Sequence, residues 1–289
     1  MNKVFLIFTF VYANLLFAGL FDDRYPSARA TAMSDAFVAV SNDVWAAYYN
    51  PAGLATVENY NFGLSYQAPY NLPFFKNYFL SGTAPLPSDF GTVGISVQNF
   101  GVSYLGNNLS GEYTFALSHG FYLMNDIHSS LSAGYNLKYY YWELGESVGG
   151  LDLGSGGTVG VDLAFQASLY GRTYVGIYFL NINAPNIGEI TKHDLPQRIV
   201  IGAAYRPQNE ITTSLAMNKT IGLDTQIEGG FEFQIIEMLA LRLGVSTDPN
   251  RFSGGFGLNY QNIYFDYAIR THPVLSETHQ FGLSYILGK

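Results

Sequence analysis

Long stretches of this sequence alternate between an apolar residue and a small or polar one. From residue 159 to 169 the odd positions hold valine, leucine, phenylalanine or alanine, and the even positions hold glycine, aspartate, alanine, glutamine or serine. A period of two residues is that of a β-strand, whose side chains point to opposite faces in turn. A soluble sandwich would carry lysine, glutamate and threonine on its outer face, whereas nearly all strand charges here fall on the small, polar face. The pattern therefore predicts strands of a transmembrane barrel, apolar toward lipid and polar toward the lumen.

Composition and charge agree with a protein that water does not cover completely. Charged residues make up 12% of the 289 residues, against about 25% in an average soluble domain. The net charge of -8 argues against a nucleic-acid partner, which would need a basic patch. The chain has no cysteine, which excludes a disulfide framework, a thiolate metal site and a lipidated N-terminal cysteine.

Counting the alternating runs gives about fourteen strands. An even number is typical of single-chain outer-membrane barrels, and closure leaves no sheet edge with unsatisfied backbone groups in lipid. The predicted fold class is therefore all-β, a transmembrane antiparallel β-barrel of about 14 strands formed by residues 60–289. The expected strands are 60–67, 75–84, 90–99, 111–123, 128–142, 157–169, 172–182, 197–206, 209–218, 222–235, 238–247, 251–260, 262–270 and 278–287.

The connections between these strands alternate in length. The first, third, fifth and seventh are long, at 67–74, 100–110, 143–156 and 183–196, whereas several even ones are tight turns. Outer-membrane barrels have short periplasmic turns and longer external loops, so both ends of the barrel should lie on the periplasmic side. All 11 prolines fall outside the expected strand interiors, as the hydrogen bonds of the sheet require.

The first 18 residues have the form of a secretory signal peptide. Lys3 precedes an apolar run from Val4 to Tyr12, and Ala18 supplies a small residue at the expected cleavage point. A transmembrane anchor is the alternative, but a span needs about 20 apolar residues and this run is shorter. We therefore expect export and a location in the bacterial outer membrane.

Residues 19–59 form a small, alanine-rich segment ahead of the first strand. Ser27 is placed as a helix N-cap, and a turn is expected at Asn50–Pro51 with Gly53. The segment could be a compact plug inside the barrel or an ordinary helix packed on the sheet, and its composition alone favours neither. The residues that would share one helical face are Ala32, Met33, Ala36, Phe37 and Val40.

Two motifs resemble those of a superfamily of outer-membrane barrels. The first runs through Arg29, Met33, Asp43, Asn50, Pro51 and Gly53, and the second through His272, Pro273 and His279. The first resembles the N-terminal hatch of FadL-type long-chain fatty-acid transporters, and both are similar to the PorV/PorQ branch. The resemblance implies a small helical hatch inside the barrel, passage of hydrophobic compounds for the fatty-acid branch, and a role in type IX protein secretion for PorV. Ser34 departs from the glycine that the family often has there.

Charged residues on the polar face of the strands should face the lumen. Because a buried charge is costly unless it is paired, we expect ion pairs between these residues and the hatch charges Arg29 and Asp43. Turn carbonyls at residues 50–52 are an alternative partner for Arg29. The wall residues are Lys138, Asp162, Arg198, Glu228, Glu232, Arg242, Asp266 and Arg270; the acidic ones are candidates for Arg29, and Arg198, Arg242 and Arg270 are candidates for Asp43.

No motif for catalysis or for a metal accompanies these charges. No Gly-x-Ser-x-Gly elbow accompanies these charges, because the one match to that pattern, residues 145–149, lies in the expected loop 143–156 and not at a strand-to-helix turn. We therefore do not predict an enzyme. His272, Glu277 and His279 in the last outer loop could meet His193–Asp194 of another loop at a zinc ion. Their spacing fits no ligand signature, so no metal and no cofactor is expected.

Three functions stay open. The main prediction is a PorV-like accessory barrel that docks exported proteins at the cell surface, with outer-membrane lipid, secretion-system components and exported proteins as partners. The alternatives are FadL-type passive transport of a hydrophobic ligand and a structural role in the envelope. The C-terminal motif favours the first through resemblance alone, and the short outer loops weaken the second.

The alternation at the C-terminal end yields a direct test. Leu283 should face lipid and Ser284 should face the lumen. Leu283→Arg should therefore destabilise the barrel by roughly 2–4 kcal/mol near the bilayer midplane, and Ser284→Arg should cost far less. Folding yields in lipid bilayers measure the difference, and equal yields would show that the faces are assigned wrongly.

Overall fold

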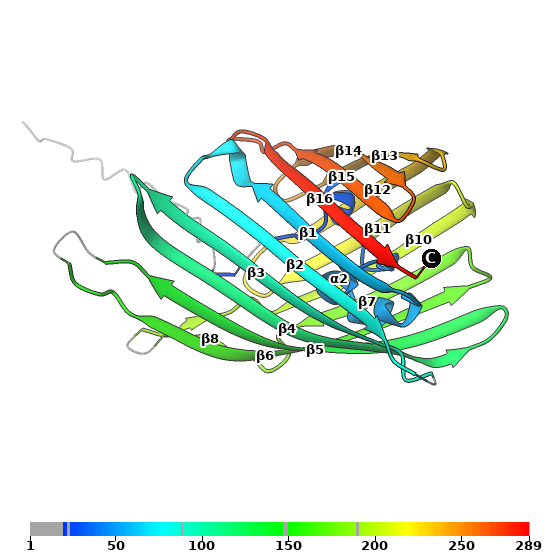
Figure 1. Cartoon of the computed structure of the whole chain (residues 1–289), viewed down its shortest axis with the longest axis horizontal. Helices are drawn as coiled ribbons and strands as arrows, with labels where there is room; N and C mark the ends of the chain where they lie inside the picture. Colours follow the sequence, from blue (N-terminus) through cyan, green and yellow to red (C-terminus); the bar gives the residue numbers. More distant parts are fainter. Residues whose placement is uncertain (1–19, 22–23, 88, 147–149, 189–190, 289) are drawn as a thin grey trace, which may run out of the picture.

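Fourteen strands form one closed antiparallel barrel in the part of the chain that the structure describes (Figure 1), as the alternation predicts. The structure is a computed structural model that describes residues 20–21, 24–87, 89–146, 150–188 and 191–288. The expected signal peptide, residues 1–18, lies outside the described residues. β1 (Tyr60–Ala68) pairs with β16 (Thr278–Leu287) and so closes the sheet.

Each remaining wall strand pairs with the wall strands before and after it in the sequence. A small ladder of β8 (Asn186–Ile187) and β9 (His193–Asp194) lies outside the wall, in the connection after β7. The remaining wall strands are β2 (Phe75–Pro85), β3 (Thr92–Tyr104), β4 (Asn107–Asn125), β5 (Ser129–Leu144), β6 (Ser155–Leu169), β7 (Thr173–Leu180), β10 (Arg198–Gln208), β11 (Ile211–Thr220), β12 (Thr225–Ile236), β13 (Leu239–Ser246), β14 (Arg251–Tyr260) and β15 (Ile263–Arg270).

The two ends of the barrel differ in their connections. One end, the turn end, carries the chain termini of the barrel and the connections 86–91, 126–128, 170–172, 209–210, 237–238 and 261–262. The opposite end, the loop end, carries the other connections, and there the hairpins β3–β4 and β5–β6 project beyond the neighbouring strands (Figure 1, left).

The prediction of a long loop at 100–110 is wrong. β3 and β4 stay paired as far as Tyr104 and Asn107, so that only residues 105–106 form the turn. Outside a membrane both faces of a hairpin can contact water, so its residues need not alternate and the strands carry no period-two signal.

Pro85 and Pro207 lie within strand bounds, at the last residue of β2 and beside a register shift of β10.

The two faces of the wall are as the alternation predicts. In β16 the side chains of Phe281, Leu283, Tyr285 and Leu287 are exposed on the outside, whereas Gln280, which directly precedes them, is fully buried inside. The same alternation of exposed apolar and buried polar residues runs through β6 and β10. The exterior is therefore an apolar surface suited to lipid.

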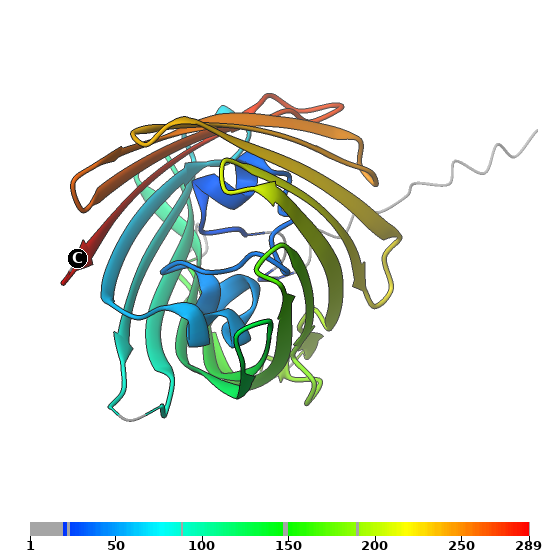
Figure 2. The same cartoon turned by 90° about the vertical axis from the view of Figure 1, so that its right-hand side faces the viewer.

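Residues 24–59, which we call the hatch, lie inside the barrel (Figure 2). The hatch contains the helices α1 (Ala28–Ala32) and α2 (Ala46–Tyr49) and the 3-10 helix η1 (Pro51–Thr56); a further 3-10 turn, η2 (Pro69–Asn71), follows β1. Ser27 caps α1, since its hydroxyl accepts the Ala30 amide at 3.1 Å. None of the described helices is long and apolar enough to cross a membrane.

The expected helix, with Ser27 as its N-cap and Val40 on its apolar face, starts as predicted but ends early. α1 stops at Ala32, and Ser34 and Asp35 both adopt left-handed backbone angles, with φ of 52° and 61°. Few non-glycine residues adopt this conformation. Contacts with the wall hold it here, because the Ser34 hydroxyl bonds Ser253 of β14 and the Asp35 carboxylate pairs with Arg270 of β15.

Pairs of glycines let the hatch backbone touch the wall. A Cβ on Gly134 would lie 2.4 Å from the Ala52 nitrogen, and one on Gly176 would lie 2.2 Å from the Val38 oxygen. Any side chain would therefore push the hatch away from the wall. The cross-strand pairs are Gly120 with Gly134, Gly176 with Gly202, and Gly230 with Gly244.

Adjacent glycines of β12 allow a matched test of this fit. A Cβ on Gly230 would lie 2.8 Å from the Met33 Cβ, whereas one on Gly229 would meet only side chains of the outer face at 3.5 Å. Gly230→Val should destabilise the protein by about 1–3 kcal/mol through overpacking, and Gly229→Val should cost much less. The free energies of unfolding in lipid vesicles measure this; equal losses would contradict close contact between hatch and wall.

Candidate functional site

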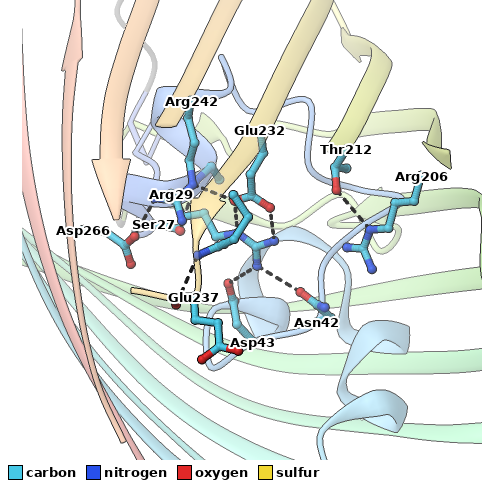
Figure 3. A network of polar contacts seen from close by, with 12 residues as sticks. Ser27, Arg29, Asn42, Asp43, Arg206, Thr212, Glu232, Glu237, Arg242 and Asp266 are labelled. Carbon is cyan, nitrogen blue, oxygen red and sulfur yellow. Dashed lines mark hydrogen bonds and ion pairs between the residues drawn. The ribbon is translucent and has the colours of Figure 1, made fainter. Parts of the chain in front are cut away.

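Arg29 ties the hatch to the wall near the turn end (Figure 3). Its Nε and Nη2 donate to the two carboxylate oxygens of Glu232 on β12, both at 2.8 Å, which is the bidentate geometry of a strong ion pair. Its Nη1 donates to Asn42 at 3.0 Å and to Asp43 at 3.3 Å. One guanidinium therefore joins α1, the 42–43 segment and the barrel wall.

Arg242 of β13 extends this network along the wall. Its Nε donates to Glu232 and its Nη1 to Asp266 of β15, each at 2.6 Å. Glu232 and Arg242 are cross-strand partners, so the sheet itself fixes their pairing. Asp266, Arg242, Glu232, Arg29 and Asp43 form one row of alternating charge. Alternation of sign offsets the cost of burying each charge.

The expectation that a wall arginine pairs with Asp43 is wrong. Arg29, from the hatch itself, is its partner, and Arg242 is already held by two carboxylates. The five donors of a guanidinium allow Arg29 to serve Glu232 and Asp43 together. Burial raises the pKa of the Asp43 carboxyl above its ordinary value, although Arg29 and the Trp45 amide lower it.

A second network, which the sequence interpretation missed, centres on Asp35. Its carboxylate pairs with Arg270 and accepts the Tyr49 hydroxyl at 3.1 Å. Arg270 also donates to Ser253 at 3.3 Å. In a continuous helix Asp35 would lie off the apolar face, so its position suggested exposure to water rather than burial.

Asp162 organises a third network, on the other side of the lumen. It accepts Lys138 at 2.7 Å, the Tyr178 hydroxyl at 2.6 Å and the Asn136 amide at 2.9 Å, and it is fully buried. The Asn136 amide also donates to the Ala47 carbonyl at 2.9 Å. Asn136 therefore links α2 to the Lys138–Asp162 pair of the wall, and Asp162 is not the partner of Arg29.

Glu228 and Arg198 are buried in the lumen in separate contacts. Glu228 accepts the Asn218 amide at 3.0 Å. Arg198 donates to Thr220 at 3.0 Å and to the Tyr25 hydroxyl at 3.4 Å. The structure thus brings Arg29, Asp43, Glu232, Arg242 and Asp266 together, and distributes the remaining wall charges elsewhere in the lumen.

The other hatch-motif residues shape the backbone. Asn50 is fully buried: its amide donates to the Val38 carbonyl at 2.7 Å and its side-chain oxygen accepts the Ala52 amide at 3.1 Å. Pro51 begins η1. A Cβ on Gly53 would lie 1.9 Å from the Ser41 oxygen, so only glycine fits. Met33 is fully buried beside the glycine pair of β12 and β13.

The C-terminal motif lies apart from these networks. His272 sits in the connection 271–277 at the loop end, with its ring centroid 5.3 Å from that of Tyr70. Burial and Arg251 lower the pKa of His272, which suits a neutral ring whose Nδ1 accepts the amides of residues 274 and 275. His279 bonds the Tyr267 hydroxyl at 2.8 Å, and Pro273 is exposed.

No metal-binding group of histidine or acidic residues occurs among the described residues.

A cavity of about 370 Å³ lies between the hatch and the wall near the turn end. Its polar lining includes Arg29, Asp43 and Asp266. Its apolar lining includes Val44, Trp45 and Ile286. Small-molecule pockets in other proteins have volumes of roughly 300–1,000 Å³, so this cavity is large enough for a small ligand, although polar residues form more of its lining than is usual.

The fold has known counterparts. The chain matches the structure of TodX, a toluene transporter of Pseudomonas putida, with a TM-score of 0.61, 14% identity, and coverage of 93% of this chain and 99% of TodX. It matches CymD, a monoaromatic hydrocarbon channel, with a TM-score of 0.64, 12% identity, and coverage of 91% of this chain and 97% of CymD. It also matches a Pseudomonas aeruginosa FadL homologue, with a TM-score of 0.61, 11% identity, and coverage of 92% of this chain and 99% of the homologue. Neither a protein-family model nor a curated protein matches the sequence. The chain therefore has the fold of FadL-type barrels, and these three matches do not show membership of the PorV/PorQ branch.

Removing Arg29 tests whether its network holds the hatch. Arg29→Ala removes the cationic partner of Asp43 and leaves one carboxylate oxygen of Glu232 without its ion pair. Breaking a buried ion pair by removing one partner lowers the free energy of unfolding by about 3–5 kcal/mol. We expect a looser hatch and a higher single-channel conductance in planar bilayers, with the barrel intact. The matched control is Arg206→Ala, since the hydrogen bonds of Arg206 join wall residues Thr212 and Tyr174. Equal conductance of both variants and the parent would contradict a retaining role for Arg29.

Proposed function

We propose that this chain is an outer-membrane barrel through which small apolar compounds pass while the hatch stays in place. The likeness of its fold to a toluene transporter and to a monoaromatic hydrocarbon channel supports this proposal. Because the similarity is in fold, the compound itself is inferred from the lumen of this chain. The proposal replaces docking of exported proteins as the main function.

The cavity at the turn end is the observation that carries the proposal. It occupies lumen that the hatch leaves open, and its volume of about 370 Å³ exceeds that of one aromatic ring, since an apolar cavity of about 150 Å³ already binds benzene. Val44, Trp45 and Ile286 supply an apolar surface along it. A solute that reaches this cavity would leave the barrel at the turn end.

The alternatives have less support. The three similar structures are transport proteins or a homologue of one, which favours passage over secretion docking and over a purely structural role. They are also not enzymes, and the carboxylates of the lumen described above are held in ion pairs or hydrogen bonds rather than arranged around a nucleophile. Secretion partners therefore have no part in the proposal.

Uptake by intact cells tests the proposed function. Cells with a lipopolysaccharide-bearing outer membrane should take up labelled toluene faster when they produce the full chain than when they carry an empty vector. The label reports passage because such a membrane is a poor route for apolar solutes. Equal uptake rates at equal amounts of folded barrel would refute passage and leave the structural role.

A reversible lock tests whether the hatch must move. The Ser34 and Ser253 hydroxyls lie 3.1 Å apart, and the chain has no cysteine of its own, so Ser34→Cys with Ser253→Cys should form a single disulfide between hatch and wall. We expect the oxidised double variant to take up toluene as fast as the reduced one. Loss of uptake on oxidation, restored by a reductant and absent from the single variants, would show that the hatch leaves its place.

A further inference from the structure

A second, smaller cavity lies between the hatch and strands β2–β5. Its volume is about 30 Å³, and its lining includes Pro26, Tyr48, Phe79 and Ala116. A space of this size holds about one water molecule. It is therefore a narrow apolar recess in the lumen, across the hatch from the polar network of Arg29.

Trp45 lines both cavities. Its side chain is 5% exposed and packs against β1 at Gly63, where a Cβ would lie 2.8 Å from the indole Cζ2. β1 lies between the strands that line the two cavities, since its neighbours in the barrel are β16 and β2. The indole is therefore the partition between the recess and the larger cavity.

The backbone around Trp45 is fixed on both sides. The Trp45 amide donates to the Asp43 carboxylate at 3.0 Å, and the Val44 carbonyl accepts the Ser81 hydroxyl of β2 at 2.9 Å. Asp43 is in turn bound by Arg29. Joining the two cavities therefore requires a change of the indole rotamer rather than a movement of the hatch backbone.

We propose that Trp45 is the gate of the passage and sets the size of apolar solute that can cross. This inference rests on the proposed function and deepens it. Because the recess holds about one water molecule, a solute is admitted beside Phe79 and Tyr48 only as the indole rotates away, and it then leaves through the larger cavity. Compounds of one ring should pass most readily, because the indole must clear a path as wide as the solute.

Truncation of the indole tests the gate in cells. Trp45→Ala should raise uptake of the two-ring compound naphthalene several-fold and uptake of toluene by less. Trp45→Phe, which keeps a smaller ring, should fall between Trp45→Ala and the parent. Trp142→Ala is the matched control, because Trp142 lines neither cavity, packs on His193 and donates to Ser110. Unchanged naphthalene uptake in Trp45→Ala would overturn the gate.

Fluorescence gives a readout that does not depend on transport. The chain has two tryptophans, so Trp142→Phe leaves Trp45 as the only one. Bromobenzene, an apolar contact quencher, should quench Trp45 saturably in lipid nanodiscs. In the variant Trp45→Phe the remaining tryptophan is Trp142. Its fluorescence should fall only linearly with bromobenzene concentration, through quencher dissolved in the lipid. Linear quenching of Trp45 would mean that no apolar solute binds beside the indole, and would also overturn the gate.

The two proposals can fail separately. If the parent takes up toluene faster than empty-vector cells but Trp45→Ala has the same selectivity, passage stands and the gate falls. If cells that produce the parent take up toluene no faster than empty-vector cells, but cells that produce Trp45→Ala take up naphthalene, the proposed function of the parent fails. Trp45 would then be a gate that stays closed in the parent. The folded fraction of each variant, measured by its heat-modifiable migration, corrects the uptake rates for barrels that fail to fold.

Discussion

The structure depends on the requirement that every backbone polar group within lipid be bonded inside the protein. Pairing of β1 with β16 meets this requirement, since it closes the sheet and removes its edges. Closure creates a second requirement, because a barrel of this many strands encloses more space than its own inward side chains can fill. The hatch occupies much of that space, and its position follows from the closure of the wall.

Small residues and paired charges solve the problem of fitting an irregular segment into a regular wall. Glycine pairs such as Gly176 with Gly202 bring the wall within contact distance of the hatch backbone. Ion pairs such as Arg29 with Glu232 then satisfy charges that the lumen hides from water. The fit is tight in most places and open beside Trp45, so passage and retention of the hatch are compatible.

The wall could be predicted from the sequence because lipid imposes one rule on every strand, and alternation records that rule residue by residue. The hatch could not, because its conformation depends on particular contacts with the wall. The left-handed Ser34 and Asp35 are held by Ser253 and Arg270, which are more than two hundred residues away in the sequence. Charge balance offered four wall carboxylates as partners of Arg29, with the turn carbonyls of residues 50–52 as the alternative, but only the position of α1 inside the barrel selects Glu232.

The central claim is that the hatch is an integral, seated part of the folded barrel. Hydrogen–deuterium exchange of the full chain in lipid nanodiscs tests it most directly, because exchange reports local opening of each segment. The account predicts that amides of the hatch between Thr31 and Val57, which donate to other hatch residues, exchange nearly as slowly as those of the wall strands and far more slowly than those of the connection 271–277. Hatch amides that exchange as fast as that connection would contradict it.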